Sequence, residues 1–178
     1  MYYGNIKPVS IENGEGVRVS LFVSGCSIHC KGCFNPETWN YFYGEPFTKD
    51  TINEIVELMD KPYVQGLSIL GGEPMDDLNQ RKVLELILTV RRVFGTTKDI
   101  WLYTGYELSE LKGELVSNIL VNCDYIVSGP FVEELKDVRL SYRGSSNQII
   151  YKTMLDKTKI GCCWFDDVTH QFDRQINN

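Results

Sequence analysis

Short apolar segments alternate with longer segments of helical periodicity along most of this chain. In Val17–Val23, apolar and polar side chains alternate with a period of two, which predicts a β-strand. Four further segments are expected to form strands by the same kind of pattern. The five expected strands cover residues 17–23, 66–70, 99–105, 124–129 and 147–152.

Helical patterns separate the expected strands. Thr51, with Glu54 three residues later, has the pattern of a capping box and predicts the start of a helix with apolar residues on one face. A longer helix is expected over residues 78–94, and a third over residues 108–120. The alternation of strands and helices predicts βαβ units and a parallel sheet with right-handed crossovers.

The length of the chain limits how these units can be arranged. With 178 residues and no linker or repeat, one domain is expected over residues 1–178, with its core at about 15–152 and a peripheral tail at 153–178. Four or five units are too few for a closed eight-stranded barrel, which takes about 250 residues. The sequence therefore predicts an α/β fold with about five strands, either an incomplete parallel β/α barrel or an open parallel sheet.

The ends of the first four expected strands share a composition of glycine and small polar residues. These ends are Ser24-Gly25, Gly71-Gly72, Thr104-Gly105 and Ser128-Gly129. In parallel α/β folds, ligands bind at the carboxyl ends of the strands. Any one of these pairs is explained equally well as an ordinary turn, but their repetition favours a single ligand site at this edge.

Composition and charge exclude several classes of protein. Hydrophobic residues make up 43% of the chain and charged residues 24%, which is typical of a globular domain. A formal net charge of −6 argues against a nucleic-acid partner. No apolar run approaches the roughly 20 residues that span a bilayer, and the N-terminal residues do not resemble a signal peptide. We therefore expect a cytoplasmic protein without a membrane partner.

Three of the six cysteines lie within eight residues, in the segment Cys-Ser-Ile-His-Cys-Lys-Gly-Cys directly after the first expected strand. In a reducing compartment, such thiols are more often metal ligands or catalytic groups than disulfides. Thiolates suit iron–sulfur clusters. A purely electron-carrying 4Fe–4S cluster normally has four cysteine ligands, whereas three leave one iron open to a small molecule. The count therefore favours a cluster that binds a ligand.

Other metal sites are possible from the same residue types. Zinc is the alternative at the first three cysteines, with His29 as a fourth ligand, although His29 lies between two of them and would crowd a tetrahedral site. Cys123 precedes an expected strand and is expected in the core. Cys162, Cys163 and His170 suggest a second metal site, but adjacent cysteines do not easily face one ion.

The cysteine spacing, its position after the first strand and the later Gly-Gly-Glu-Pro turn resemble the radical S-adenosylmethionine (SAM) superfamily. In that superfamily, three cysteines hold a 4Fe–4S cluster whose unique iron binds the amino and carboxylate groups of SAM. The similarity narrows to the anaerobic ribonucleoside-triphosphate reductase activating proteins. Gly32 stands where the superfamily often has an aromatic residue, and Phe34 follows the third cysteine as in that subfamily. The similar segments are 13–39, 66–74, 100–106, 124–131 and 142–148.

The resemblance implies which residues meet the cluster and SAM. Cys26, Cys30 and Cys33 would anchor the cluster. Glu73 would bind the SAM ammonium, and the alternative is an acidic residue at a helix N-terminus. Arg18 would pair with Glu73 or with a SAM carboxylate, or form a structural salt bridge. The other residues expected near SAM are Gly32, Phe34, Gly71, Gly72, Tyr103, Thr104, Gly105, Tyr106, Ser128, Gly129 and Asn147.

The implied activity is that of an oxidoreductase similar to the enzyme that activates formate C-acetyltransferase. Such an activase cleaves SAM reductively and takes a hydrogen atom from a glycine of its partner, here the large subunit of anaerobic ribonucleotide reductase. Flavodoxin or a similar carrier would supply the electron. The alternatives are another glycyl radical activator, an enzyme similar to 7-carboxy-7-deazaguanine synthase, an electron-transfer iron–sulfur protein and a zinc-stabilised interaction module.

Overall fold

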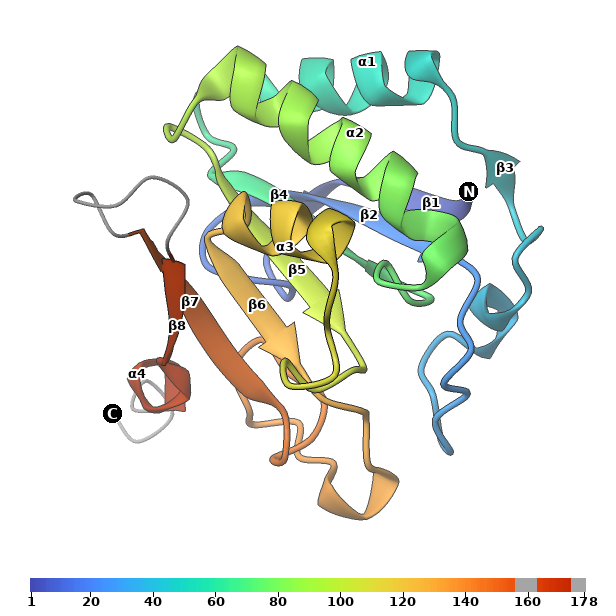
Figure 1. Cartoon of the computed structure of the whole chain (residues 1–178), viewed down its shortest axis with the longest axis vertical. Coiled ribbons are helices and arrows are strands. Elements are labelled where there is room, and N and C mark those ends of the chain that lie inside the picture. The colour runs from blue at the N-terminus through green and yellow to red at the C-terminus, as the bar shows by residue number, and fades with distance from the viewer. Residues whose placement is uncertain (156–162, 174–178) are drawn as a thin grey trace.

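A computed structural model of the chain describes residues 1–155 and 163–173. Its strands are β1 (Tyr2–Ser10), β2 (Arg18–Ser24), β3 (Glu45–Pro46), β4 (Gly66–Gly71), β5 (Asp99–Thr104), β6 (Tyr125–Ser128), β7 (Ile149–Leu155) and β8 (Cys163–Asp167). Its α-helices are α1 (Lys49–Met59), α2 (Asp77–Phe94), α3 (Glu114–Val121) and α4 (Thr169–Asp173). All eight strands form one open sheet in the order β3-β1-β2-β4-β5-β6-β7-β8 (Figure 1).

The centre of the sheet confirms the predicted α/β class. Neighbouring strands β2, β4, β5 and β6 are parallel, and α1, α2 and α3 connect them in turn. The expected fifth strand, β7, is antiparallel to β6, and the expected count of about five strands is wrong. A parallel neighbour needs a long crossover, usually helical. Between β6 and β7 the chain forms only a short 3₁₀ helix, Glu133–Leu135, so β7 returns antiparallel.

The sequence patterns missed the first strand of the sheet. β1 pairs antiparallel with β2, and its pairing register shifts around Gly4 and again between Lys7 and Ser10. Pro8 lies within the second shift. Glycine and proline both disfavour regular strands, and proline is tolerated there only at edges and bulges. These interruptions hide the period of two in the sequence.

Two helices begin at different residues from those expected. The N-cap of α1 is Thr48, and Thr51 is the third residue of the helix, where its side chain accepts from the Thr48 backbone. The capping box therefore lies three residues earlier than the sequence predicted. α3 begins at Glu114 and not at residue 108, because Gly113 precedes it with φ +108°, outside the helical region. Leu108 and Leu111 pack against the core from the turns before the helix.

Thr48→Ala is expected to lower the free energy of unfolding by about 1 kcal/mol, because the backbone N–H of Thr51 loses its acceptor. Urea unfolding of the metal-free protein, followed by circular dichroism, measures the loss. Thr48→Ser keeps the hydroxyl and should leave the stability close to that of the wild type. An unchanged stability of Thr48→Ala would contradict this position for the cap.

The two faces of the sheet differ in what covers them. Val19, Leu21 and Val23 of β2 face a core that includes the apolar sides of α1, α2 and α3, which lie together on one side of the sheet (Figure 1). On the other face, a second core joins Trp101 of β5 to Phe172 of α4, with ring centroids 5.5 Å apart. Within the segment after residue 152, which was expected to be peripheral, Val168 and Phe172 are buried in this second core.

Candidate functional site

The three clustered cysteines lie on one loop, residues 25–35, that follows β2 and is called the cysteine loop below. Its beginning is fixed by backbone hydrogen bonds. The Gly25 N–H donates to the carbonyl of Thr38 (2.8 Å), and the Gly25 carbonyl accepts from the Glu73 N–H (2.7 Å). The cysteine loop is thereby attached both to the 3₁₀ helix Pro36–Trp39 and to the turn that follows β4.

Backbone groups lie near the sulfur atoms of the three cysteines, and one backbone N–H forms a hydrogen bond to a sulfur. The Asn35 N–H donates to Sγ of Cys33 (3.4 Å). The Cys26 thiol meets the backbone of Ile28 and His29, and the Cys30 thiol meets the backbone of Phe131. Such contacts suit thiolates that ligate a metal centre, since N–H···S bonds stabilise the thiolate form and tune cluster potential. All three side chains are free thiols in the described chain.

When no metal is bound, burial favours the protonated thiols, whereas the backbone contacts favour the thiolates. Burial raises the pKa of Cys26 and Cys30, and the nearby carboxylate of Glu73 contributes a smaller effect in the same direction. The metal-free chain therefore holds these thiols in the protonated form near neutral pH. A bound metal centre reverses this preference, because coordination deprotonates a thiol outright.

One cavity of about 560 Å³ unites the cysteine loop with the carboxyl ends of the central strands. Several of the residues expected near SAM line it, namely Phe34, Gly71, Gly72, Glu73, Tyr103, Thr104, Gly105 and Gly129, together with Cys26, Cys30 and Cys33. Side chains that sequence reasoning missed also line it, among them Phe131, Arg143 and Gln148. The strand ends that share a composition in the sequence therefore do share one space.

Glu73 connects two strand ends inside this cavity. Its side chain is 1% exposed. One carboxylate oxygen accepts from the Met75 N–H and the Thr104 hydroxyl, each at 2.8 Å, and the other accepts from the Gly105 N–H at 2.7 Å. A carboxylate offers about four acceptor sites, so these three donors leave one for a ligand ammonium.

The buried Glu73 carboxylate should make stability depend on pH. Burial outweighs its hydrogen bonds and raises the pKa of Glu73 to about 7, from 4.5. The folded chain then keeps this proton to a higher pH than the unfolded chain does. The free energy of unfolding should therefore fall as pH rises from about 5 to about 8, by about 2–3 kcal/mol from this group.

Glu73→Gln removes this titration and provides the comparison. Urea unfolding of the metal-free wild type and of Glu73→Gln at both pH values gives the difference between them at each pH. The change in this difference between the two pH values should equal the loss of about 2–3 kcal/mol expected from Glu73. Any destabilisation by the amide that does not depend on pH cancels in the subtraction. Equal pH dependence in the two proteins would show that Glu73 does not titrate in this range.

The glycines at the strand ends allow backbone segments to touch each other. A Cβ on Gly72 would lie 2.4 Å from the carbonyl oxygen of Gly25 and 2.9 Å from that of Thr38. Gly25 has φ +96°, and a Cβ there would collide with the Tyr41 ring. The sequence suggested close approach to a ligand, whereas at these two positions the close neighbour is the protein itself.

Four of the residues expected near SAM do not line the cavity. Gly32 lies against the side chain of Glu133. The Ser128 hydroxyl donates to the carbonyl of Tyr106 (2.9 Å), and the Asn147 amide donates to the carbonyl of Pro130 (2.8 Å). The Tyr106 hydroxyl donates to Asp76 (2.8 Å). Gly129 and Gln148, which follow Ser128 and Asn147 in the sequence, line the cavity instead.

His29 is occupied by a contact with an aromatic ring. Its imidazole stacks on Trp39 with ring centroids 4.6 Å apart and planes 21° apart. In the described chain, no three His, Cys, Asp or Glu side chains are grouped so that they would hold one metal ion. A zinc site with His29 as fourth ligand would require His29 to leave Trp39.

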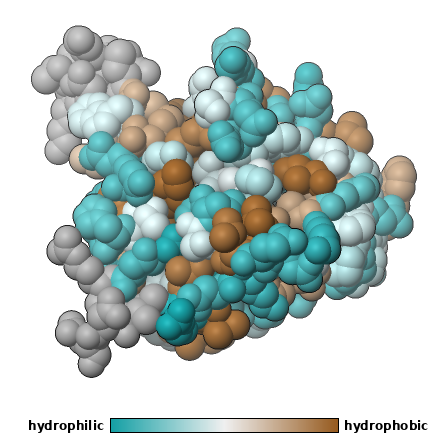
Figure 2. Space-filling view, turned by 90° about the horizontal axis from the view of Figure 1, so that it is seen from below, coloured by the Kyte–Doolittle hydropathy of each residue, from teal (hydrophilic) through white to brown (hydrophobic). Residues whose placement is uncertain are grey.

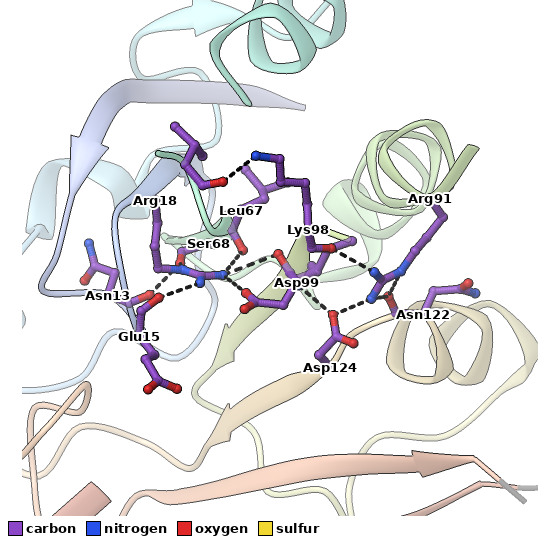
Figure 3. A network of polar contacts seen from close by, with 12 residues as sticks. Asn13, Glu15, Arg18, Leu67, Ser68, Arg91, Lys98, Asp99, Asn122 and Asp124 are labelled. Atoms are coloured by element: carbon purple, nitrogen blue, oxygen red, sulfur yellow. Dashed lines mark hydrogen bonds and ion pairs between the residues drawn. The ribbon is translucent and has the colours of Figure 1, made fainter. Parts of the chain in front are cut away.

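Arg18 does not pair with Glu73. It lies at the first residue of β2, whereas the cysteine loop follows the last, so the two are separated by the length of the strand. Figure 3 shows its guanidinium between Ser68 and Asp99. Arg18 is fully buried and forms an ion pair with Asp99, so the structural salt bridge is the correct alternative.

The remaining cysteines lie away from the cysteine loop. Cys123 is 2% exposed and belongs to the main core, which confirms its expected place. Cys163 is on β8 and His170 on α4, while Cys162 lies outside the described residues. No helix within residues 1–155 and 163–173 combines the length and the apolar character needed to cross a membrane.

Comparison with known proteins places this site in a family. Residues 12–151 match a family model described as a 4Fe-4S single cluster domain. An anaerobic ribonucleoside-triphosphate reductase-activating protein of Escherichia coli (strain K12) is 41% identical over 154 residues, covering 85% of this chain and 98% of that protein. The chain belongs to this family of activating proteins.

Activating proteins of the same name from other sources show similar agreement. The protein of Vibrio cholerae serotype O1 is 39% identical over 157 residues, which is 87% of this chain and all of that protein. The protein of Enterobacteria phage T4 is 38% identical over 151 residues, which is 85% of this chain and 94% of that protein. The cysteine loop and its cavity are thus features of an activating protein with a 4Fe-4S domain.

Proposed function

We propose that this chain is a radical SAM activase that generates the glycyl radical of an anaerobic ribonucleotide reductase. The observation that carries the proposal is the set of three thiols that line the same cavity as Glu73. The relatives are named as activating proteins of anaerobic ribonucleoside-triphosphate reductase, and we infer from these names that this reductase is the partner. When bound, the reduced 4Fe–4S cluster supplies one electron that splits SAM into methionine and a 5′-deoxyadenosyl radical, which takes a hydrogen atom from glycine.

The residues of the cavity divide the work of binding. Cys26, Cys30 and Cys33 hold the cluster and leave one iron open for SAM. Glu73 uses its fourth acceptor site for an N–H of the SAM amino group, while Tyr103 and the ends of β4 and β5 form the adjoining wall. Phe34 shields the cluster from the side of the 129–148 loop, where its ring lies 5.1 Å from that of Phe131.

The open sheet suits a protein substrate. We propose that the face of the parallel strands β2, β4, β5 and β6 opposite α1, α2 and α3 corresponds to the interior of the incomplete radical SAM barrel. Seen from below, the molecule exposes apolar surface among polar groups (Figure 2). Phe34, which lines the cavity, is exposed, and so are Leu135 and Val138 in the segment between β6 and β7. Contact with the reductase at this end would exclude water from the site while the radical forms.

The test is to combine the protein, reconstituted under anaerobic conditions, with SAM, a reductant and the candidate reductase, and to record the paramagnetic resonance spectrum. The doublet of a glycyl radical on the reductase is expected, together with 5′-deoxyadenosine. We propose that the protein acts in the cytoplasm with a flavodoxin-like electron donor. Using reduced flavodoxin as the reductant tests this donor. A 4Fe–4S spectrum that does not respond to SAM would overturn the catalytic proposal and favour plain electron transfer.

A further inference from the structure

A buried carboxylate outside the cavity joins three separate segments around the cysteine loop. Asp76 is 5% exposed. Its Oδ2 accepts from the Ser27 N–H (2.9 Å) and the Tyr41 hydroxyl (2.6 Å). Its Oδ1 lies 2.7 Å from the Ser27 hydroxyl and 2.8 Å from the Tyr106 hydroxyl. We call Ser27, Tyr41, Asp76 and Tyr106 the Asp76 junction.

Helix capping does not explain this carboxylate. Asp76 is the N-cap residue of α2, a position where aspartate normally accepts from the helix N–H groups. Here the side chain makes no capping hydrogen bond. All of its acceptor capacity goes to the cysteine loop, to the segment after the 3₁₀ helix Pro36–Trp39 and to the loop after β5. The helix gives up a cap worth about 1 kcal/mol to place this group.

The Asp76 junction contacts the cysteine loop and does not reach the cavity expected to hold SAM. Asp76 does not line the cysteine cavity but borders a second, separate cavity of about 360 Å³. Its nearest target, Ser27, directly follows Cys26. Both oxygens of the Asp76 carboxylate contact Ser27, so its charge lies next to the residue that follows Cys26.

We propose that Asp76 is a positioning residue that holds the cysteine loop in the geometry that binds the cluster and that its charge lowers the reduction potential of that cluster. The inference rests on the proposed three-cysteine site. Partners outside the ligand set that orient ligands commonly change metal affinity by about 10–100-fold when removed. Negative charge near an iron–sulfur cluster disfavours the added electron.

Two substitutions separate geometry from charge. Asp76→Ala removes both the acceptors and the charge. Asp76→Asn removes only the charge, because its oxygen can accept from Ser27 N–H and Tyr41, while its amide donates to the hydroxyls of Ser27 and Tyr106, which can act as acceptors. Asp77 is exposed and adjacent, so Asp77→Ala and Asp77→Asn are controls with the same change of net charge.

The experiment measures iron loss to a chelator and the reduction potential of the reconstituted proteins. Asp76→Ala should lose iron at least about tenfold faster than Asp77→Ala. Asp76→Asn should keep iron as the wild type does, with a more positive potential than Asp77→Asn. If Asp76→Ala does not fold, as judged by circular dichroism, Tyr106→Phe provides the milder disruption and should also accelerate iron loss.

Equal iron loss in Asp76→Ala and Asp77→Ala would overturn the positioning role, as would unchanged iron loss in Tyr106→Phe if that variant has to be used. Equal potentials in Asp76→Asn and Asp77→Asn would overturn the role of the charge. A 4Fe–4S spectrum retained by Cys30→Ala would instead refute the three-cysteine site, so the two proposals fail on different measurements.

Discussion

Replacing Cys30 with alanine is expected to eliminate the 4Fe–4S spectrum and to reduce 5′-deoxyadenosine formation to the level seen without protein. The reason is the number of ligands. Three thiolates are the fewest that hold a cluster with one open iron, and the loss of one leaves two irons without a protein ligand. The measurements are iron content, the visible spectrum after anaerobic reconstitution, and chromatographic detection of 5′-deoxyadenosine.

The fold should survive this substitution, because Cys30 lies on the cysteine loop and outside both apolar cores. Far-ultraviolet circular dichroism of Cys30→Ala should match that of the wild type. Cys163→Ala is the matched control, since it removes a thiol from β8 at the far edge of the sheet and should keep both cluster and product. Product formation by Cys30→Ala would refute the ligand assignment.

Replacing Arg18 with alanine is expected to lower the free energy of unfolding by about 3–5 kcal/mol. Its guanidinium donates to the Ser68 hydroxyl (2.8 Å) and to the Leu67 carbonyl (2.9 Å), and it pairs with Asp99 (Figure 3). Without it, a largely buried carboxylate and several acceptors lose their partner. Chemical unfolding of the metal-free proteins measures the loss.

The double variant Arg18→Met with Asp99→Asn should recover part of this stability, because it leaves no uncompensated charge. Arg18 lies about 20 Å along β2 from the cysteine loop, so the KM for SAM should not change at a temperature where the variant is folded. An increase in that KM with unaltered stability would support the rejected alternative, in which Arg18 binds a SAM carboxylate.

The sequence predicts the central sheet well and its edges poorly. The buried strands β2, β4, β5 and β6 have continuous or alternating apolar patterns, and the structure confirms all four within one or two residues. Strands β1 and β8 owe their conformation to pairing with a neighbour rather than to a pattern of their own. The direction of β7 depends on the absence of a crossover helix between residues 128 and 149, which no local pattern within β7 records.

The candidate site is predictable where its residues form a motif. The three cysteines lie within eight residues and the Gly-Gly-Glu-Pro turn within four, so each can be recognised as a local motif. Arg143 and Gln148 reach the cavity through the irregular segment before β7, and Asp76 reaches the cysteine loop across 49 positions of sequence. Such contacts depend on tertiary packing. The one available signal for Asp76 is its place two residues after the Gly-Gly-Glu-Pro motif.

The interruptions in β1 protect the sheet against intermolecular association. In the described chain, β3 covers only Tyr2 and Tyr3 on the outer side of β1. The rest of this strand is an edge to which a strand of another molecule would otherwise add. Pro8 offers no N–H, Lys7 carries a charge, and the register shifts bend the edge away from a flat template. The N-terminal strand thus disfavours aggregation while it completes the sheet.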